Sequence, residues 1–269
     1  MRYIELCRNK ELNNMNEKEF VNKLISRMKI EREKEDRSGI YGYVQRKLAY
    51  NSNRIEGSTL TEEQTASLFD TRTIISNGEV IRSKDVEEMS GHFLMFNHML
   101  DTLDQDLSEE LIKQFHYYLK VGVFEDRANG YPCGEYKNRR NVVSDISVTL
   151  PADVPDKMRR FISNYHSKEH HSIDDLALMH GDYESIHPFQ DGNGRTGRII
   201  LFRECLKNDL IPLIIDNNNK ALYNNSLNNY QKNNDNGEKL INYLKSEQKD
   251  FYEKTYDLIF PIPLSHNKG

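Results

Sequence analysis

The sequence has few residues that break helices, with 14 glycines and 7 prolines among 269 positions. Soluble proteins usually contain roughly 12% glycine plus proline. This scarcity favours long helices over a sandwich of many short strands. The length suits one large domain or two small ones, and it is sufficient for a hydrophobic core.

Cysteine is also scarce, and Cys7, Cys133 and Cys205 lie far apart. This spacing excludes a disulfide framework and a metal finger, so we expect reduced thiols in a cytosol-like compartment. The formal net charge of −5 argues against a basic surface that binds nucleic acid.

Long apolar runs are missing as well. The first residues lack the apolar segment of a secretory signal, and no run approaches the ~18 residues that a membrane span needs. We therefore expect a cytoplasmic protein with no membrane and no nucleic-acid partner. A translocated effector without a cleavable signal is the alternative.

Most of the chain shows apolar residues at helical spacing. Helices are expected over residues 16–36 and 40–55, in runs that begin at Thr61, Asp85 and Ser108, and over residues 154–162, 172–186, 195–206 and 240–251. Only residues 141–150 show strand character, with β-branched residues on either side of Ser144 and Asp145. The pattern predicts an all-α fold with one short β-hairpin.

Two of these helical patterns are joined by the segment His187-Pro188-Phe189-Gln190-Asp191-Gly192-Asn193-Gly194-Arg195-Thr196-Gly197-Arg198. Proline biases the residue before it toward an extended backbone, so we expect the first helix to end at His187. The two Asx-Gly pairs require positions that tolerate a positive φ, and their glycines let backbone N–H groups face a ligand. The second helix begins with free N–H donors, so the segment has the features of an anion-binding loop.

The charged side chains of this segment suit a polyphosphate. Arg195 and Arg198 are three residues apart, so both should project from one side of the first helical turn. Asp191 is a hard oxygen ligand suited to Mg²⁺, and His187 has the ordinary pKa of a general base. Each feature alone is commonly structural, but together they predict a phosphate or nucleotide site. It is not a Walker loop, because no Gly-Lys-Ser/Thr follows.

The same segment resembles the signature of the Fic (Fido) family, His-x-Phe-x-Asp/Glu-Gly-Asn-Gly-Arg-x-x-Arg, with every fixed position filled. The wider similarity runs from about Ser108 to Leu244 and includes Gly134-Glu135-Tyr136. The resemblance implies a mostly helical protein adenylyltransferase, which uses ATP and Mg²⁺ to place AMP on a Ser, Thr or Tyr hydroxyl of a target protein and of itself. It divides the chain into an N-terminal helical region (1–108), a catalytic core (109–244) and a C-terminal helix and tail (245–269).

The resemblance also implies roles for the charged residues of the signature. His187 would take the proton from the attacking hydroxyl, and Asp191 would hold Mg²⁺ against the α- and β-phosphates. Arg195 would bind the phosphates nearer the ribose, and Arg198 would bind the γ-phosphate.

Further roles follow for the uncharged residues. Asn193, with the backbone of Gly192 and Gly194, would form an anion hole. Phe189 would anchor the loop in the core. Tyr223 would lie near the adenine, although core packing explains this residue equally well. The expected hairpin resembles the family's target flap, where a substrate segment adds as an extra strand; its residues are Asn141, Val142, Val143, Val148, Thr149 and Leu150.

A second resemblance lies upstream, in the Ser-x-x-x-Glu-Gly pattern formed by Ser52, Glu56 and Gly57. Ser52 and Glu56 are four residues apart and share a helix face, as many surface pairs do. Beside a Fic signature the pattern is similar to the family's inhibitory helix, here over about residues 40–56. The resemblance implies that Glu56 pairs with Arg198 and occupies the place of the γ-phosphate. The same glutamate could instead orient a water that removes AMP.

Other readings stay open at this point. His166, His170, His171 and His180 suggest a metal hydrolase, although no general base lies between the first two. A non-enzymatic, nucleotide-gated interaction module is a second possibility, and transfer of UMP, GMP or phosphocholine is a third. The identity of the target protein stays open, and a homodimer that stabilises the inhibitory helix is possible.

Overall fold

The computed structural model describes residues 17–76, 78–141 and 148–261. These residues form helices and connecting loops, which confirms the expected all-α class. In chain order the helices are α2 (Glu17–Glu33), α3 (Ile40–Ile55), α4 (Glu62–Thr71), α5 (Ser83–Asp101), α6 (Glu109–Lys120), α7 (Phe124–Ala128), the 3₁₀ turn η1 (Pro151–Asp153), α8 (Val154–Tyr165), α9 (Ile173–Ile186), α10 (Asn193–Lys207), the 3₁₀ turn η2 (Asn217–Asn219), α11 (Lys220–Gln231) and α12 (Glu238–Ile259).

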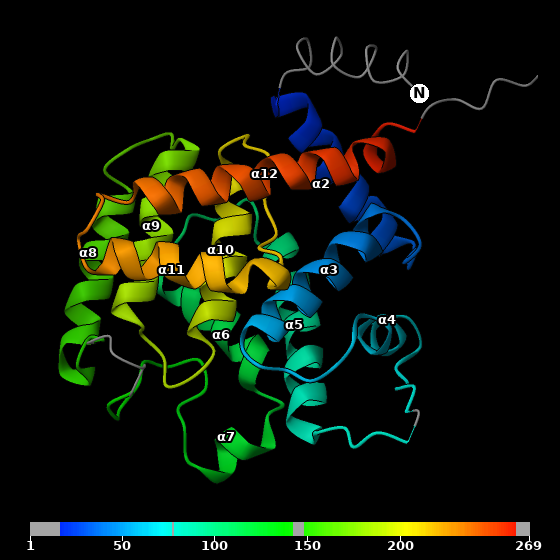
Figure 1. Cartoon of the computed structure of the whole chain (residues 1–269), viewed down its shortest axis with the longest axis horizontal. Helices are drawn as coiled ribbons and strands as arrows, with labels where there is room; N and C mark the ends of the chain where they lie inside the picture. Colours follow the sequence, from blue (N-terminus) through cyan, green and yellow to red (C-terminus); the bar gives the residue numbers. More distant parts are fainter. Residues whose placement is uncertain (1–16, 77, 142–147, 262–269) are drawn as a thin grey trace, which may run out of the picture.

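Helix α10 lies at the centre of the fold, in contact with α3, α5, α6 and α9 (Figure 1). Apart from Gly194, every residue from Asn193 to Leu206 is buried. A helix enclosed on all sides shows little amphipathic patterning, so its charged residues must find partners inside the protein. The loop at its N-terminus is thereby fixed against the core.

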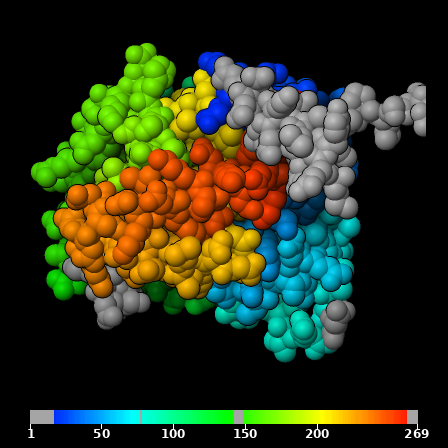
Figure 2. Space-filling view, turned by 45° about the horizontal axis from the view of Figure 1, so that its top comes forward, coloured from blue at the N-terminus to red at the C-terminus, as the bar shows by residue number. Residues whose placement is uncertain are grey.

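Helices α11 and α12 lie side by side at the surface and cover α9 (Figures 1 and 2). Leu240, Leu244 and Phe251 of α12 are buried, as their spacing predicts. The helix is continuous across residue 244, where the boundary of the catalytic core was expected. One hydrophobic core contains residues from α2 through α12, and no helix in the described part of the chain is long and apolar enough to span a bilayer.

Most of the expected helix starts are present. Thr61 and Ser172 each close a capping box, and Ser108 Oγ accepts a hydrogen bond from Leu111 N. The expected start at Asp85 is wrong, because α5 begins at Ser83. The carboxylate of Asp85 instead accepts hydrogen bonds from Thr59 N and from the guanidinium of Arg82, so it ties the end of α3 to α5 rather than capping a helix.

The β-hairpin expected over residues 141–150 is not seen. Val142 and Val143 lie outside the described residues, while Asn141 and residues 148–150 have no strand conformation. Asn141 Nδ2 donates to the carbonyl oxygens of Phe189 and Gln190 at 2.9 and 3.0 Å. Alternating β-branched residues form a strand only where a partner strand pairs with them, and here the near end of the segment hydrogen-bonds to a loop instead.

Candidate active site

The loop over residues 187–192 joins α9 to α10. Helix α9 ends at Ile186, as expected, but His187 is left-handed with φ 52° rather than extended. Histidine is among the residues that tolerate this region. Gly192 has φ 82°, which favours glycine. The second expected positive-φ position, Gly194, is instead helical and lies inside α10.

Side chains inside the loop hold its shape. Asn193 Oδ1 accepts from Phe189 N at 2.7 Å, and Asn193 Nδ2 donates to Phe189 O at 2.8 Å. The side-chain amide of Asn193, which was expected in an anion hole, therefore bonds across the loop. Only the backbone N–H of Asn193 is left to bind an anion. The buried Phe189 ring stacks on His116, with ring centroids 3.9 Å apart.

His116 also fixes the loop, a role that no local pattern in the sequence indicates. Its Nδ1 accepts from Gly134 N at 2.9 Å, so the ring proton resides on Nε2. That nitrogen lies 3.0 Å from the carbonyl oxygen of Asp191 and donates to it. The Gly134-Glu135-Tyr136 stretch is thus connected to the signature loop through one imidazole.

A pocket of about 360 Å³ opens beside this loop. Its walls include His187, Gly194 and Arg198 of the signature, Tyr223 of α11 and Glu56 of α3. The structure therefore brings together residues that were singled out separately in the sequence, from α10, from α11, from the end of α3 and from the loop.

Arg198 is 4% exposed and is held by the end of α3. Its Nε donates to Ser52 Oγ at 2.8 Å, and its Nη2 donates to Ser52 O at 3.0 Å and to Glu56 Oε1 at 2.6 Å. Burial disfavours the charged carboxylate, but Arg198 and Arg195 hold the pKa of Glu56 below its ordinary value. A Cβ at Gly194 would lie 2.3 Å from Glu56 Oε1, so the glycine leaves the space that this carboxylate occupies.

Arg195 has different partners, although it also comes from the first turn of α10. Its Nη1 lies 2.6 Å from Glu88 Oε2 on α5, and its Nη2 lies 3.4 Å from Asp191 Oδ2. Arg195 Nη1 also donates to Asn53 Oδ1 on α3 at 3.3 Å. Arg195 therefore pairs with a carboxylate on α5, whereas Arg198 pairs with the carboxylate at the end of α3.

Asp191 is the acidic residue of the loop, and its side chain is 39% exposed. Its Oδ2 also lies 2.7 Å from Lys120 Nζ. Burial opposes ionisation, but Arg195 and Lys120 hold the pKa of Asp191 well below its usual range. An ionised, partly exposed carboxylate beside the N-terminus of a helix fits a Mg²⁺ ligand that would act together with phosphate oxygens.

His187 is half-buried at the rim of the pocket. Burial and the positive charge of Lys137 lower its pKa to about 4, so the imidazole is neutral at neutral pH and able to accept a proton. Lys137 N donates to Pro188 O at 2.9 Å. Lys137 Nζ is buried and has no hydrogen-bond partner among the described residues, and burial with the charge of Lys157 lowers its pKa to about 8.

Two further residues line the pocket. Tyr223 is 2% exposed and its hydroxyl lies 2.7 Å from His180 Nε2, so it packs as a core residue while one side borders the pocket. Glu184, one turn before His187, was not recognised in the sequence. Its Oε1 is buried without a hydrogen-bond partner, and burial raises its pKa to about 7.

Three of the histidines that suggested a metal hydrolase contact other partners. His166 Nε2 lies 2.7 Å from Leu107 O, His171 stacks on Tyr165, and His180 faces Tyr223. Across the described residues, no three or more His, Cys, Asp or Glu side chains are grouped to hold a metal ion. The geometry does not support a protein-built metal cage.

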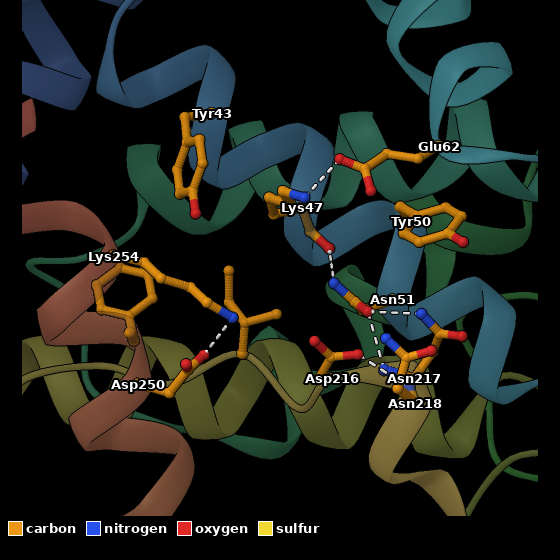
Figure 3. A pocket seen from close by; sticks show the side chains of 12 residues that line it. Tyr43, Lys47, Tyr50, Asn51, Glu62, Asp216, Asn217, Asn218, Asp250 and Lys254 are labelled. Carbon is orange, nitrogen blue, oxygen red and sulfur yellow. Dashed lines mark hydrogen bonds and ion pairs between the residues drawn. The ribbon is translucent and has the colours of Figure 1, made fainter.

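A second pocket, of about 370 Å³, lies between α3, η2 and α12 (Figure 3). Lys254 pairs with Asp250 at 2.7 Å. Asn51 Oδ1 accepts from the backbone N and the Nδ2 of Asn217 at 2.9 and 3.0 Å, which connects α3 to η2 (Figure 3). Because these polar groups satisfy one another, we assign no ligand to this pocket.

Comparison with known proteins shows a consistent likeness. Residues 106–204 match the family model described as Fic/DOC family. Curated proteins named "Protein adenylyltransferase Fic" are similar, with 29% identity over 177 residues in Drosophila virilis and 28% over 169 residues in Nematostella vectensis. These alignments cover 65% and 62% of this chain but only 35% and 38% of the relatives, so the chain spans little more than a third of their length.

Solved structures share the fold. A Fic domain-containing signaling protein from Bacteroides thetaiotaomicron superimposes with a TM-score of 0.73 at 24% identity, covering 91% of this chain and 97% of that one. Fic-1 from C. elegans superimposes with a TM-score of 0.64 at 18% identity, covering 93% and 76%. At these identities the likeness establishes the fold.

Proposed function

We propose, because residues 106–204 match the Fic/DOC family model, that this chain is a protein adenylyltransferase that moves AMP from ATP to a hydroxyl side chain of a target protein and of itself. The observation that carries the proposal is that His187, Gly194, Arg198 and Tyr223 line one pocket. Nucleotidyl transfer depends mainly on positioning and charge neutralisation, and this pocket provides both.

The reaction follows from the positions of these groups. His187, neutral at neutral pH, accepts the proton of the target hydroxyl while the oxygen attacks the α-phosphorus. The bond from that phosphorus to the bridging oxygen of pyrophosphate breaks, and pyrophosphate leaves. Arg195 and the backbone N–H groups of residues 192–194 bind the inner phosphates, and Arg198 binds the γ-phosphate.

Mg²⁺ fits this arrangement through Asp191. Magnesium sites at phosphates commonly use one or two carboxylates and complete the octahedron with phosphate oxygens and water. When bound, the ion would neutralise negative charge on the phosphates. The ionised, partly exposed carboxylate of Asp191 is the protein's contribution, because the loop already holds it at the N-terminus of α10.

We further propose that the enzyme is autoinhibited by Glu56. A carboxylate that already neutralises Arg198 excludes the γ-phosphate from the same guanidinium. The N–H donors of Arg198 also contact Ser52. ATP would therefore bind productively only after the end of α3 moves away.

The target would approach past the segment that ends at Leu150. Val148 lines the same pocket as His187, and the side chain of Leu150 is 43% exposed. A target segment that binds beside these residues would place its hydroxyl near the imidazole. This proposal concerns the docking place and requires no hairpin.

The test is mass spectrometry after incubation with ATP and Mg²⁺. The Glu56→Gly variant should gain the mass of one or more AMP groups, the wild type much less, and Glu56→Gly with His187→Ala none. A parallel panel of GTP, UTP and CDP-choline separates AMP transfer from related transfers. If the Glu56→Gly variant binds Mg·ATP without modifying any protein, a nucleotide-gated module replaces the enzyme; if it binds no nucleotide, both assignments are wrong.

A further inference from the structure

Lys120, the last residue of α6, is buried beneath the signature loop among three carboxylates. Its Nζ lies 2.6 Å from Glu88 Oε1 on α5, 2.6 Å from Asp126 Oδ2 on α7 and 2.7 Å from Asp191 Oδ2. The lysine side chain is only 2% exposed. A buried ammonium needs such partners, because it has given up its hydration.

The three carboxylates differ in exposure. Those of Glu88 and Asp126 are 9% and 6% exposed, whereas that of Asp191 is 39% exposed and reaches the surface of the site. Including Arg195, the cluster holds two positive and three negative side chains. One negative charge is therefore left over, and Asp191 is the place where a ligand can reach it.

Both cations contact the same oxygen of this carboxylate. Lys120 Nζ and Arg195 Nη2 lie 2.7 and 3.4 Å from Oδ2 of Asp191. Contacts on one oxygen fix the orientation of the carboxylate. They also weaken its attraction for a further cation, since like charges repel at these distances.

We propose that Lys120 is a positioning residue for Asp191, which holds the carboxylate toward the phosphates and keeps its affinity for a free divalent cation low. The ion then binds together with the nucleotide, whose phosphates supply the remaining negative charge. The inference rests on the role proposed for Asp191 in nucleotidyl transfer, and it adds a residue that the signature does not contain.

Mn²⁺ binding measured by electron paramagnetic resonance, with and without ATP, tests the proposal in the Glu56→Gly background. The double variant Lys120→Met/Asp126→Asn removes the lysine and keeps the net charge of the cluster. It should bind free Mn²⁺ about tenfold more tightly than the parent, which corresponds to about 1.4 kcal/mol. Adding Asp191→Asn should abolish that gain. Unchanged affinity for free Mn²⁺ in a folded double variant overturns the proposal.

The matched control is Lys84→Met. Lys84 also joins α5 to α7, through Glu125 at 3.2 Å, but this pair is exposed. Its loss should leave Mn²⁺ binding unchanged. An equal gain in this control would show that loosening the two helices is sufficient, and it would overturn the specific role of Lys120.

If the double variant does not fold, Asp126→Asn alone provides a milder test. It removes one competitor for Lys120, so the lysine should hold Asp191 more tightly and the affinity for Mn²⁺ without ATP should fall about threefold; an unchanged affinity counts against the proposal. These measurements need no transfer of AMP. A positive Mn²⁺ result in a protein that modifies nothing would refute the proposed function and leave the positioning role intact.

Discussion

Arg198 Nη2 donates to Glu56 Oε1 at 2.6 Å across 142 positions of sequence. The contact joins the end of α3 to the first turns of α10, and it lies in the pocket that contains His187. Its two ends sit on helices that pack against each other, so a small displacement of α3 is sufficient to break it.

Replacing Ser52 with alanine should activate the enzyme less than replacing Glu56 with glycine. The hydroxyl accepts from Arg198 Nε at 2.8 Å, and a hydrogen bond to a charged group contributes about 1.5–3 kcal/mol. At about 1.4 kcal/mol per tenfold, we expect AMP transfer to rise by about tenfold to a hundredfold, measured as initial rates of auto-modification. In the Glu56→Gly background the same substitution should add nothing, and further activation there would contradict the shared mechanism.

Asn51→Ala should activate the enzyme from a position outside the active site. Asn51 anchors α3 to η2 through Asn217 (Figure 3), so its loss weakens the docking of the turn that carries Ser52 and Glu56. The two hydrogen bonds contribute about 1 kcal/mol each, so their joint loss predicts a rise in transfer of roughly thirtyfold. Asn225→Ala, at an exposed position on α11, is the control. Equal rates in Asn51→Ala and wild type would show that this tether does not hold the inhibited state.

Lys137→Met should shift the acidic limb of the pH–activity profile to higher pH. In the proposed mechanism activity requires neutral His187, and burial together with Lys137 lowers the pKa of that imidazole to about 4. Without the lysine charge the pKa of His187 rises toward its ordinary value, so the rate at pH 5.5 relative to pH 8 should fall. Profiles of kcat/KM against pH in the Glu56→Gly background measure this, with Lys113→Met as control. An acidic limb at the same pH as in the parent would show that the charge of Lys137 does not lower the pKa of His187.

Glu184→Gln should stabilise the protein at pH 8 but not at pH 4.5. Burial raises the folded-state pKa of Glu184 to about 7 from an ordinary 4.5, so the native state retains a proton that the unfolded chain releases. The free energy of unfolding of the wild type therefore falls as pH rises through this window. Above pH 7 the loss approaches about 3 kcal/mol, at 1.36 kcal/mol per pKa unit.

Chemical denaturation of Glu184→Gln at both pH values measures that difference. Glu63→Gln, at an exposed position on α4, should show no pH-dependent change. A gain for Glu184→Gln that is equal at the two pH values would mean that the substitution acts through packing and not through the charge of the carboxylate.

Much of the architecture was predictable from local patterns. Helix α3 begins and ends where the spacing of apolar residues and Gly57 place it, and the capping residues Thr61, Ser108 and Ser172 act as expected. Capping and amphipathic periodicity are local properties, so a single chain reveals them. The expected hairpin is not seen for the opposite reason. A strand depends on a partner strand, and the periodicity of one segment does not specify that partner.

The signature residues were recognised because they lie within twelve positions of one another, and their order alone indicated a phosphate-binding loop. Their partners were not recognisable in this way. These partners lie in α5 and α6, far in the sequence from the signature, and nothing in their local sequence marks them. They are Glu88, His116 and Lys120. Long-range ion pairs and ring stacking leave no periodic trace, so only the packing of α5 and α6 against α10 reveals them.

The order of residues thus determined the helical class, the loop chemistry and the candidate base, because each depends on neighbours along the chain. The tertiary structure decided which charges meet: Arg198 with Glu56, and Asp191 with Lys120. Electrostatic attraction acts through space, and it strengthens when burial removes the water between two charges. The packing of the helices therefore decides that Asp191 is ionised and that Arg198 is already paired.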